Sequence, residues 1–559
     1  MCAAPRAGKH ANRIRFVPDG VVYDPLYDTR EPGCFKHRVP TEVVLGRPVL
    51  THLSMPGGRD FCTRHLTLLP NSVSPEFDVV VVGFGPVGTV MAALLARRGI
   101  SVLAVDRDVE LFPLPRAAHF DQEMMRVLQE LDCAHLVGPA TIVNPGMDFL
   151  NADGKVLLSM RPDGPTPSGW PASVLFFQPD LELVLRDAAH RAGATVRLGC
   201  AVDAVHDHGD HVEVRFADDS STTAAYVVAC DGARSTVRKQ LGITMHDLEF
   251  EEPWLVLDLV LDDPAARPSP LTLQVCDPAR PTTLVPMPEP RFRFEFMQLP
   301  DEDPAELARP DHVRSMLAKW MDPDAARVER AAVYTFHGLI ADEWRRGRVL
   351  LAGDAAHQTP PFLGQGMCSG VRDAANLAWK LRRVLDGSSP DELLDTYQVE
   401  RGPQVQQIIQ LAVDFGRIIC TTDHAVAAER DAGMLAAREA GGGRAGAAAM
   451  PPLPGGPLIG DGGGAQLRQV EVDGRRLDDL IGDRFALLAR TADLLHATAA
   501  QRWIAAGATT FDAVNTPAVA ESLDAASADV VVVRPDRYLL SAGAEVPSPD
   551  DTTTALLGL

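Results

Sequence analysis

The chain has 559 residues, of which 46% are hydrophobic and 23% charged, and its formal net charge is −22. This composition is typical of a globular protein with enough apolar side chains for several domains. The acidic balance argues against nucleic acid and anionic membrane as partners, because both attract clustered lysine and arginine.

Nothing in the chain indicates a membrane or secreted protein. No stretch reaches the roughly 18 apolar residues that a membrane span needs. The first residues, MCAAPRAGKH, contain no apolar signal region. The nine cysteines are dispersed without a C-x-x-C pair, so neither a disulfide framework nor a metal site is expected. We therefore predict a cytoplasmic protein with reduced thiols.

The first element with a clear pattern follows an extension, residues 1–75, which lacks periodicity and is expected to be poorly ordered. Residues 79–82 and 102–105 are continuous apolar runs, typical of buried parallel strands. A helical pattern lies between them, and Gly99 stands where that helix is expected to end.

The turn before that helix, GFGPVG, has the G-x-G-x-x-G spacing of a dinucleotide-binding motif. Gly83 allows the tight turn, Gly85 lets a pyrophosphate approach the backbone, and Gly88 lets helix and strand pack closely. Asp106 ends the next strand and is placed to bind a ribose. The motif predicts an ADP-containing cofactor without choosing FAD over NAD; turn glycines present by chance are the alternative.

A second candidate segment is YVVACDGARSTVRKQLG, in which a strand over residues 226–229 runs into Asp231. Arg234 and Arg238 follow and could meet pyrophosphate groups. Taken alone, this segment is equally compatible with a plain turn.

Residues 250–340 contain runs typical of β-strands. In RFRFEFMQL, phenylalanines alternate with charged residues, which predicts a half-buried strand of an antiparallel sheet with one face in water. Core packing is the default role of Phe292, Phe294 and Phe296, and a wall of a substrate cavity is the alternative.

The loop GDAAHQTPPFLGQGM is the most informative segment. Asp354 follows a strand and can accept hydrogen bonds from a ribityl chain, which FAD has and NAD lacks. Pro360 and Pro361 stiffen the backbone, and Gly364 and Gly366 let it approach a flat ring. An apolar stripe predicts a helix that begins near Gly366, with its N-terminus toward the negative charge of a reduced flavin. We interpret the loop as the segment that lies against the flavin ring.

The last part of the chain predicts a separate small unit. Residues 440–464 form a Gly/Pro-rich linker after an Ala-rich helical region. RFALLAR and DVVVVRPDRYLL then suggest a small α/β unit with a hairpin turn at Pro535 and Asp536.

Together, these motifs resemble the class A FAD-dependent aromatic hydroxylases, which have the para-hydroxybenzoate hydroxylase fold. PRAAHFDQEMMRVLQEL, FFQPDLELVLRDAA and PPFLGQGMCSGVRDAANLAWKL resemble in particular the 3-(3-hydroxyphenyl)propionate/3-hydroxycinnamate hydroxylases. The resemblance implies an α/β fold: an FAD-binding Rossmann-like domain of glutathione-reductase type with an inserted mixed or antiparallel substrate sheet. It also implies a thioredoxin-like C-terminal unit, which has no cysteine for dithiol chemistry.

The expected division of the chain follows from this likeness. The expected parts are an FAD-binding domain (76–250 and 338–420), a substrate sheet (251–337), a helical and linker region (421–465) and the C-terminal unit (466–559).

The resemblance also implies site residues. With the glycine motifs, the residues expected to bind FAD are Gly83, Gly85, Gly88, Asp106, Arg107, Arg116, Gln178, Asp231, Gly353, Asp354, Gly364, Gly366 and Met367. Pro361 and Phe362 are expected to face the substrate.

The implied reaction is hydroxylation of a phenol. NADH or NADPH would reduce FAD, and O2 would form a flavin C4a-hydroperoxide that transfers OH to a small phenol of the 3-(3-hydroxyphenyl)propionate type. Alternatives are a tailoring hydroxylase of aromatic polyketides and a flavoprotein that does not hydroxylate. The W-x-W-x-I-P motif of flavin halogenases is absent. A homodimer is a family-level expectation.

His119 is the candidate catalytic base, since a phenol reacts faster as phenolate and an imidazole has a suitable ordinary pKa. A histidine that only packs or donates a hydrogen bond is at least as good an interpretation. Asp121 could orient His119, although capping of the following helix is the simpler role. His357, just after the Gly-Asp turn, is expected to be structural.

Overall fold

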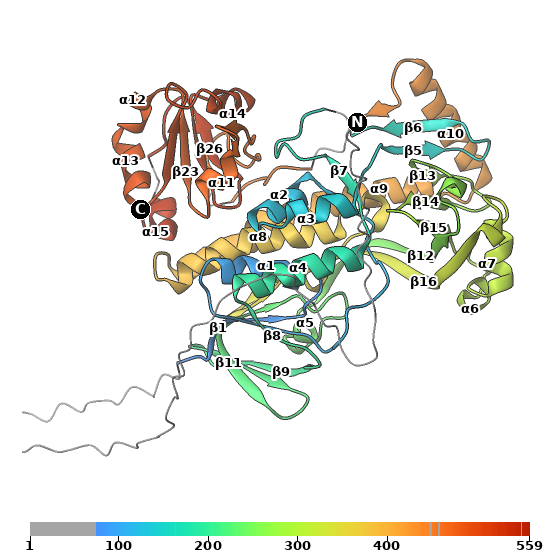
Figure 1. Ribbon diagram of the computed structural model, residues 1–559, viewed down its shortest axis with the longest axis horizontal. Helices are drawn as coiled ribbons and strands as arrows, with labels where there is room; N and C mark the ends of the chain where they lie inside the picture. Colours follow the sequence, from blue (N-terminus) through green and yellow to red (C-terminus); the bar gives the residue numbers. More distant parts are fainter. Residues whose placement is uncertain (1–73, 163, 447–449, 457–458, 549–550) are drawn as a thin grey trace, which may run out of the picture. The chain divides into compact units, whose positions relative to one another are not determined.

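The computed structural model describes residues 74–559, apart from 163, 447–449, 457–458 and 549–550 (Figure 1). The predicted N-terminal extension therefore lies almost wholly outside the described residues. Within them, no helix combines the length and apolar character that crossing a membrane requires.

A mostly parallel sheet, with β17 antiparallel to β18 at one edge, forms the centre of the first domain. Its strand order is β17-β18-β11-β1-β2-β8, with β9 and β10 added as an antiparallel extension at β11. The strands are β1 (Phe77–Val82), β2 (Val102–Val105), β8 (Thr195–Arg197), β9 (Val202–Asp207), β10 (Val212–Phe216), β11 (Ser221–Ala229), β17 (Arg345–Arg346) and β18 (Val349–Leu351). The carboxyl ends of β1, β2, β11 and β18 meet at one edge, where doubly wound sheets bind ligands.

Helices cover this sheet, and Figure 1 shows α1, α4 and α8 lying together over one face. The helices of the domain and its neighbourhood are α1 (Pro86–Arg97), α2 (Gln122–Glu130), α3 (Ala134–Val137), α4 (Gln178–Ala192), α5 (Thr236–Gln240), α8 (Gly366–Leu385), α9 (Thr396–Ile419) and α10 (His424–Glu439). Helix α1 is buried along most of its length, which explains its nearly uniform apolar sequence. Gly99 follows the C-cap residue Arg98 with a φ of +76°, as its predicted place at the helix end requires.

A nine-stranded mixed sheet forms the second layer, in the order β19-β16-β12-β15-β14-β13-β5-β6-β20. Its strands are β5 (Met147–Leu150), β6 (Val156–Met160), β12 (Met245–Leu261), β13 (Thr272–Val275), β14 (Thr282–Pro286), β15 (Arg291–Met297), β16 (Ala326–Ala341), β19 (His357–Gln358) and β20 (Arg444–Ala445). Because β5, β6, β19 and β20 join it, the sheet is not confined to residues 251–337. Helices α6 (Pro304–Leu307) and α7 (Pro310–Leu317) cover one side of it.

The prediction that β15 turns one face to water is wrong. Its phenylalanines pack in a core cluster with Val313 and Leu317 of α7, so they are core residues. The opposite face is also buried, because Arg293 pairs with Asp258 (Nε to Oδ1, 2.8 Å) and donates to the carbonyl of Pro115 at 2.6 Å. Sequence alternation alone could not show that a second layer covers the charged face.

A small three-stranded sheet, β3-β7-β4, carries His119 on its strand β3. Its strands are β3 (His119–Asp121), β7 (Ser173–Leu175) and β4 (Ile142–Val143), all antiparallel. Register places His119 opposite Leu175.

The C-terminal unit has a thioredoxin-like topology. Its four strands run in the order β24-β23-β25-β26, with β23 and β24 parallel and the others antiparallel. The strands are β23 (Ala486–Ala489), β24 (Thr509–Asp512), β25 (Val530–Val533) and β26 (Leu539–Gly543), preceded by the ribbon β21 (Glu471–Val472) and β22 (Arg475–Arg476). The helices are α11 (Leu477–Ile481), α12 (Ala492–Leu495), α13 (Thr498–Ala505), α14 (Val519–Ala525) and α15 (Asp551–Leu557). The predicted hairpin turn at Pro535 and Asp536 joins β25 to β26.

Candidate flavin and substrate site

The three glycines of the first loop have different surroundings. Two of them leave no room for a side chain because the backbone packs tightly there, and the third faces open space that a ligand could fill. A Cβ atom on Gly83 would lie 2.4 Å from the Cys230 carbonyl oxygen, and one on Gly88 only 1.9 Å from that of Gly83. A Cβ on Gly85 would meet nothing within 4 Å. Helix α1 begins directly afterwards, with no side-chain cap and no acidic residue in its first turn. Open space beside uncapped N–H groups suits a pyrophosphate.

Asp106 ties the end of β2 to the glycine loop. Its Oδ2 accepts from the backbone N–H of Phe84 at 2.7 Å, and its Oδ1 accepts from that of Asp108 at 2.9 Å. The side chain is half-buried, which leaves further acceptor capacity at the sheet edge. Arg107 is exposed and only pairs with Asp108, so the geometry gives it no distinct role at the site.

The second glycine segment packs directly onto the first. Gly353 has a φ of +60°, and a Cβ on it would press on Val87 of α1 at 3.1 Å. A Cβ on Gly370 of α8 would come within 2.5 Å of the same valine. Asp354, next to Gly353, is exposed at this junction, whereas its neighbours are buried. The structure thus brings the two motifs together, although 265 residues separate Gly88 from Gly353.

His357 is structural, as expected. It is fully buried, and its Nε2 lies 2.6 Å from Oδ2 of Asp373, which also accepts the backbone N–H of Gly353 at 3.0 Å. Arg401 donates to the other oxygen of Asp373 at 3.0 Å. These contacts hold the Gly353 turn against α8.

The loop before α8 ends in two glycines with different roles. Gly364 has a φ of +63°, and a Cβ on it would lie 2.6 Å from Nδ1 of His119. A Cβ on Gly366 would meet nothing closer than 4.0 Å. Helix α8 begins at Gly366, as predicted, without a side-chain cap, and Met367 is half-buried in its first turn. Its free N–H groups suit a group that carries negative charge.

Gln178 fixes the backbone that precedes His119. Its Oε1 accepts from the N–H groups of Arg116 (2.8 Å) and Ala117 (2.7 Å), and its Nε2 donates to Glu182 at 2.7 Å. The guanidinium of Arg116 is exposed above the Phe112 ring. Direct contact of either residue with FAD stays a prediction.

Asp231 caps a short helix. Its Oδ2 accepts from the N–H groups of Thr236 and Val237 at the start of α5. Arg238, which the sequence placed near pyrophosphate, is instead buried and donates to the carbonyl of Ala355 at 2.9 Å. It therefore braces the Asp354 turn, while Arg234 is exposed.

His119 is enclosed, and its environment departs from the prediction of an ordinary pKa. Burial lowers the pKa of the imidazole, although nearby Asp121 opposes that shift. Nε2 lies 2.7 Å from the Ser173 hydroxyl, and Nδ1 lies 3.3 Å from the Gly364 carbonyl oxygen. A neutral ring with Nδ1–H donating to Gly364 and Nε2 accepting from Ser173 satisfies both contacts.

Asp121 has the simpler of its two predicted roles. Its Oδ1 accepts from the N–H groups of Glu123 and Met124 and so caps α2, and its Oδ2 accepts from Arg372. Despite burial, Arg372 holds the pKa of this carboxyl below its usual value. Its influence on His119 is through charge, and a catalytic role stays a prediction.

The residues expected to face the substrate lie at an aromatic cluster. Phe362 is buried, and its ring centroid lies 5.8 Å from those of Phe250 and Trp254 and 6.3 Å from that of Phe336. Pro361 is half-buried at the same turn. The cluster is a rigid apolar wall beside the flavin loop; contact of Pro361 or Phe362 with substrate stays a prediction.

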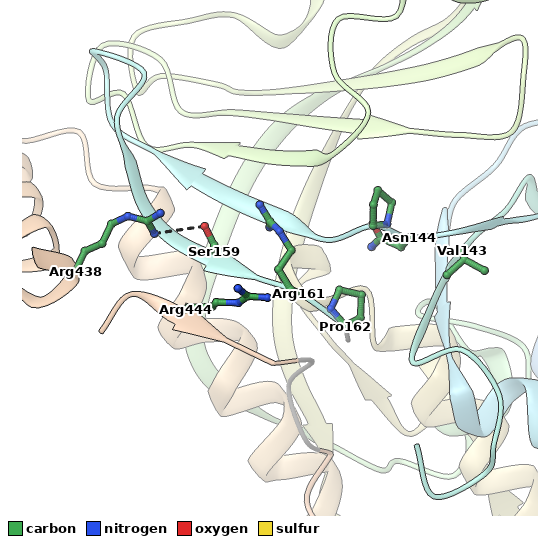
Figure 2. Close-up of a pocket in the computed structure, with 8 residues that line it drawn as sticks. Val143, Asn144, Ser159, Arg161, Pro162, Arg438 and Arg444 are labelled. Carbon is green, nitrogen blue, oxygen red and sulfur yellow. Dashed lines mark hydrogen bonds between the residues drawn. The ribbon is translucent and has the colours of Figure 1, made fainter. Parts of the chain in front are cut away.

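Sequence reasoning missed a basic pocket of about 530 Å³ beside the small sheet (Figure 2). Its lining residues are Val143, Asn144, Pro145, Ser159, Arg161, Pro162, Arg438 and Arg444. Asn144 Nδ2 donates to the Ser173 hydroxyl at 2.9 Å, so one residue separates the pocket wall from His119. Three arginines, one directly after β6, one in α10 and one in β20, line this pocket in a chain with a net charge of −22. No sequence motif predicts this pocket, because its arginines lie far apart along the chain.

A known family covers the part of the chain that builds this site. The family model described as an FAD binding domain (FAD_binding_3) matches residues 76–412, more than half of the chain. The chain belongs to this family of FAD-dependent aromatic hydroxylases. The glycine loops of this hydroxylase fit the cofactor, since the backbone is open at Gly85 and Gly366, beside two uncapped helix N-termini.

Two relatives and one solved structure illustrate the likeness. A probable NADH-specific resorcinol 4-hydroxylase of Rhodococcus jostii (strain RHA1) is 44% identical over 66% of this chain and 71% of its own. A 3-(3-hydroxy-phenyl)propionate/3-hydroxycinnamic acid hydroxylase of Mycolicibacterium smegmatis is 33% identical over 86% of this chain and 93% of its own. The crystal structure of aklavinone-11 hydroxylase with FAD and aklavinone has a TM-score of 0.71 at 24% identity, covering 87% of this chain and 100% of that one. That last likeness shows the fold.

Proposed function

We propose that this hydroxylase acts on a monocyclic phenol with a second substituent meta to the hydroxyl group, using NADH or NADPH and O2. Resorcinol and 3-(3-hydroxyphenyl)propionate, which appear in the relatives' names, both have that pattern. FAD, when bound, takes electrons from the reductant and activates O2, and the protein supplies orientation, a dry cavity and fixed charge.

Within this proposal, His119 and Ser173 accept the phenolic proton. The hydroxyl of Ser173 donates to Nε2 of His119 and accepts from Asn144, so it can pass a proton onward to the imidazole. Because burial lowers the pKa of His119, the ring is neutral at neutral pH and free to act as the acceptor. Asp121 would stabilise the imidazolium that forms.

The arginine pocket is the observation that favours a carboxylated phenol of the 3-(3-hydroxyphenyl)propionate type. Arginine binds carboxylates through two parallel hydrogen bonds. Arg161 is held in place by the carbonyls of Met147 and Met160 and by Asp148, and Arg438 by Ser159 and Gly443. Guanidinium donors of this kind suit an anionic side chain, and the Asn144–Ser173–His119 contacts link one wall of the pocket to His119.

Resorcinol is the second candidate, because the resorcinol 4-hydroxylase of Rhodococcus is 44% identical to this chain. A neutral diol would leave the arginine pocket unused. A polycyclic polyketide substrate has the weaker support of a fold likeness at 24% identity.

The test uses purified protein loaded with FAD. Oxidation of NADH and NADPH, O2 uptake, peroxide and products are measured with 3-(3-hydroxyphenyl)propionate, resorcinol and a polycyclic quinone. We expect the highest kcat/KM, a dihydroxylated product and little peroxide with the carboxylated phenol. A higher kcat/KM for resorcinol would replace the carboxylated substrate with the neutral one, and no stimulation by any monocyclic phenol would contradict the proposal.

A further inference from the structure

The turn that joins β25 to β26 in the C-terminal unit contacts buried polar groups of the first domain. Tyr538 and Arg534 are almost fully buried there, although they lie next to a hairpin turn, where exposure is usual. Tyr538 donates to Oε2 of Glu123, in α2, at 2.7 Å. Arg534 donates to Oε2 of Glu400, in α9, at 2.8 Å.

From Glu123 the contacts continue to the loop before α8. The other oxygen of Glu123 accepts from Nε of Arg372 at 2.7 Å. The same guanidinium donates through Nη1 to the side chain of Gln365 at 3.0 Å and through Nη2 to Asp121. Gln365 is the N-cap residue of α8 and lies between Gly364 and Gly366. Tyr538 is therefore connected to the predicted flavin loop through two side chains.

A second set of contacts reaches the same helix from the same turn. Asn376 of α8 donates to Asp536 at 3.2 Å and to Glu400 at 3.0 Å, and Lys380 donates to Glu400 at 2.8 Å. These groups are almost completely buried, so each lost partner leaves an uncompensated charge or dipole. The turn thus contacts α8 at Asn376 directly and at Lys380 through Glu400.

We propose that the β25–β26 turn is a positioning element of the FAD site, in which Tyr538 acts on Gln365 through Glu123 and Arg372. The C-terminal unit then contributes to FAD binding and is not only a structural addition to the first domain. The proposal rests on residues 353–367 being the flavin loops, and it does not depend on which phenol is hydroxylated.

The experiment measures the Kd of the full-length apoprotein for FAD by fluorescence titration, together with the visible spectrum of the bound flavin. Tyr538→Phe removes one hydroxyl and should raise the Kd about three- to tenfold, a size usual for coupling through packed networks. Tyr226→Phe is the matched control, because the Tyr226 hydroxyl also donates to a carboxylate, that of Asp391, whose other side-chain partner is Arg345 and not a residue of the flavin loops. Its Kd should equal that of the unaltered protein.

A double-mutant cycle distinguishes specific coupling between Tyr538 and Gln365 from a general destabilisation of the fold. Gln365→Ala alone should raise the Kd for FAD. The double variant, which also carries Tyr538→Phe, should have a Kd raised by a factor much smaller than the product of the two single-variant factors. Thermal unfolding of each apoprotein shows that it is folded. Should Tyr538→Phe fail to fold, Asp536→Asn tests the same turn through Asn376 and should also raise the Kd.

Two results would overturn the proposal. A Kd for Tyr538→Phe equal to that of Tyr226→Phe, with Gln365→Ala still weakening FAD, would remove the C-terminal turn from the cofactor site. An unchanged Kd for Gln365→Ala would remove the flavin-loop premise, while substrate turnover would still test the proposed function separately.

Discussion

His119 takes its properties from residues that are distant in the sequence. The Gly364 carbonyl oxygen lies 3.3 Å from Nδ1, Ser173 contacts Nε2, and burial lowers the pKa of the imidazole. A glycine is required at 364 because any side chain there would collide with the histidine. The residue that sequence reasoning chose as a base is thus an oriented imidazole whose pKa is lowered by burial, and the proposed proton acceptor is the pair that it forms with Ser173.

His119→Ala should therefore lower the rate of hydroxylation by about a hundredfold or more, the usual size of a general-base contribution. Reduced flavin would still consume O2, so peroxide per NADH should rise. The measurement is product and peroxide in the same reaction, with His246→Ala, an exposed histidine on β12, as the control. Unchanged rate and coupling in His119→Ala would remove this residue from the mechanism.

The pH dependence of the same step follows from the lowered pKa of His119. Its proton acceptor should stay available down to a pH below the ordinary histidine value of about 6.5. The rate of hydroxylation should hence show no loss attributable to His119 above that pH, and Ser173→Ala should lower the rate without shifting the profile. A rate that falls through a pKa above 6.5, and no longer does so in His119→Ala, would contradict the assigned protonation state.

Arg438 tests the choice of substrate. Arg438→Gln should raise the KM for 3-(3-hydroxyphenyl)propionate about tenfold or more, since one charge-assisted hydrogen bond contributes about 1.5–3 kcal/mol. The KM for resorcinol should not change, because it has no carboxylate. Arg417→Gln, on an exposed arginine of α9, is the matched control. Equal effects on both substrates would mean that the pocket does not select the anionic group.

At the scale of elements, local motifs were predictable and long-range contacts were not. The glycine loops, the start of α8 and the β25–β26 turn follow from residue types at fixed spacings along one short segment. The burial of both faces of β15, the Asn144–Ser173–His119 chain and the arginine pocket depend on which elements meet in space. Asn144 and Ser173 are 29 residues apart, and neither belongs to a motif, so no pattern in the sequence marks them.

Gly85, just before α1, and Gly88, in the first turn of α1, should respond differently to substitution, because only Gly85 has open space around it. Gly85→Ala should raise the Kd for FAD at least tenfold, equivalent to about 1.4 kcal/mol, and leave the unfolding temperature of the apoprotein nearly unchanged. Its φ of −76° is open to alanine, and its Cβ would enter the space assigned to pyrophosphate. Gly88→Ala should instead destabilise the apoprotein. If Gly85→Ala bound FAD normally, the phosphate site would have to lie elsewhere.

At the scale of the whole molecule, buried ion pairs join the C-terminal unit to the first domain. Although burial disfavours its charged form, Arg534 and Lys380 hold the pKa of Glu400 at about 2. Asp478, which pairs with Arg126 and Arg537, also has a lowered pKa despite burial. These carboxylates lie on both sides of the junction, so the attachment of the C-terminal unit depends on their charge.

Stability should accordingly be lost in acid. A carboxylate whose pKa is lower in the folded than in the unfolded state contributes stability that is fully present above the unfolded value, about 4.5, and is lost as the pH falls toward 2. Chemical unfolding between pH 6 and pH 3 measures this loss. Glu400→Gln should lower stability at pH 6 and weaken the dependence on pH, because Lys380 and Arg534 lose their partner. An unchanged pH dependence in this variant would contradict the assigned role of Glu400.

Isotope incorporation is the most direct measurement of the central claim, that this FAD-dependent hydroxylase adds oxygen to a carboxylated phenol. The FAD-loaded protein would turn over 3-(3-hydroxyphenyl)propionate with NADH or NADPH under ¹⁸O₂, and the mass of the product would be determined by mass spectrometry. We predict a dihydroxylated acid with one labelled oxygen for each NAD(P)H consumed. Electrons recovered entirely as peroxide, with the phenol returned unlabelled and unchanged, would contradict the account.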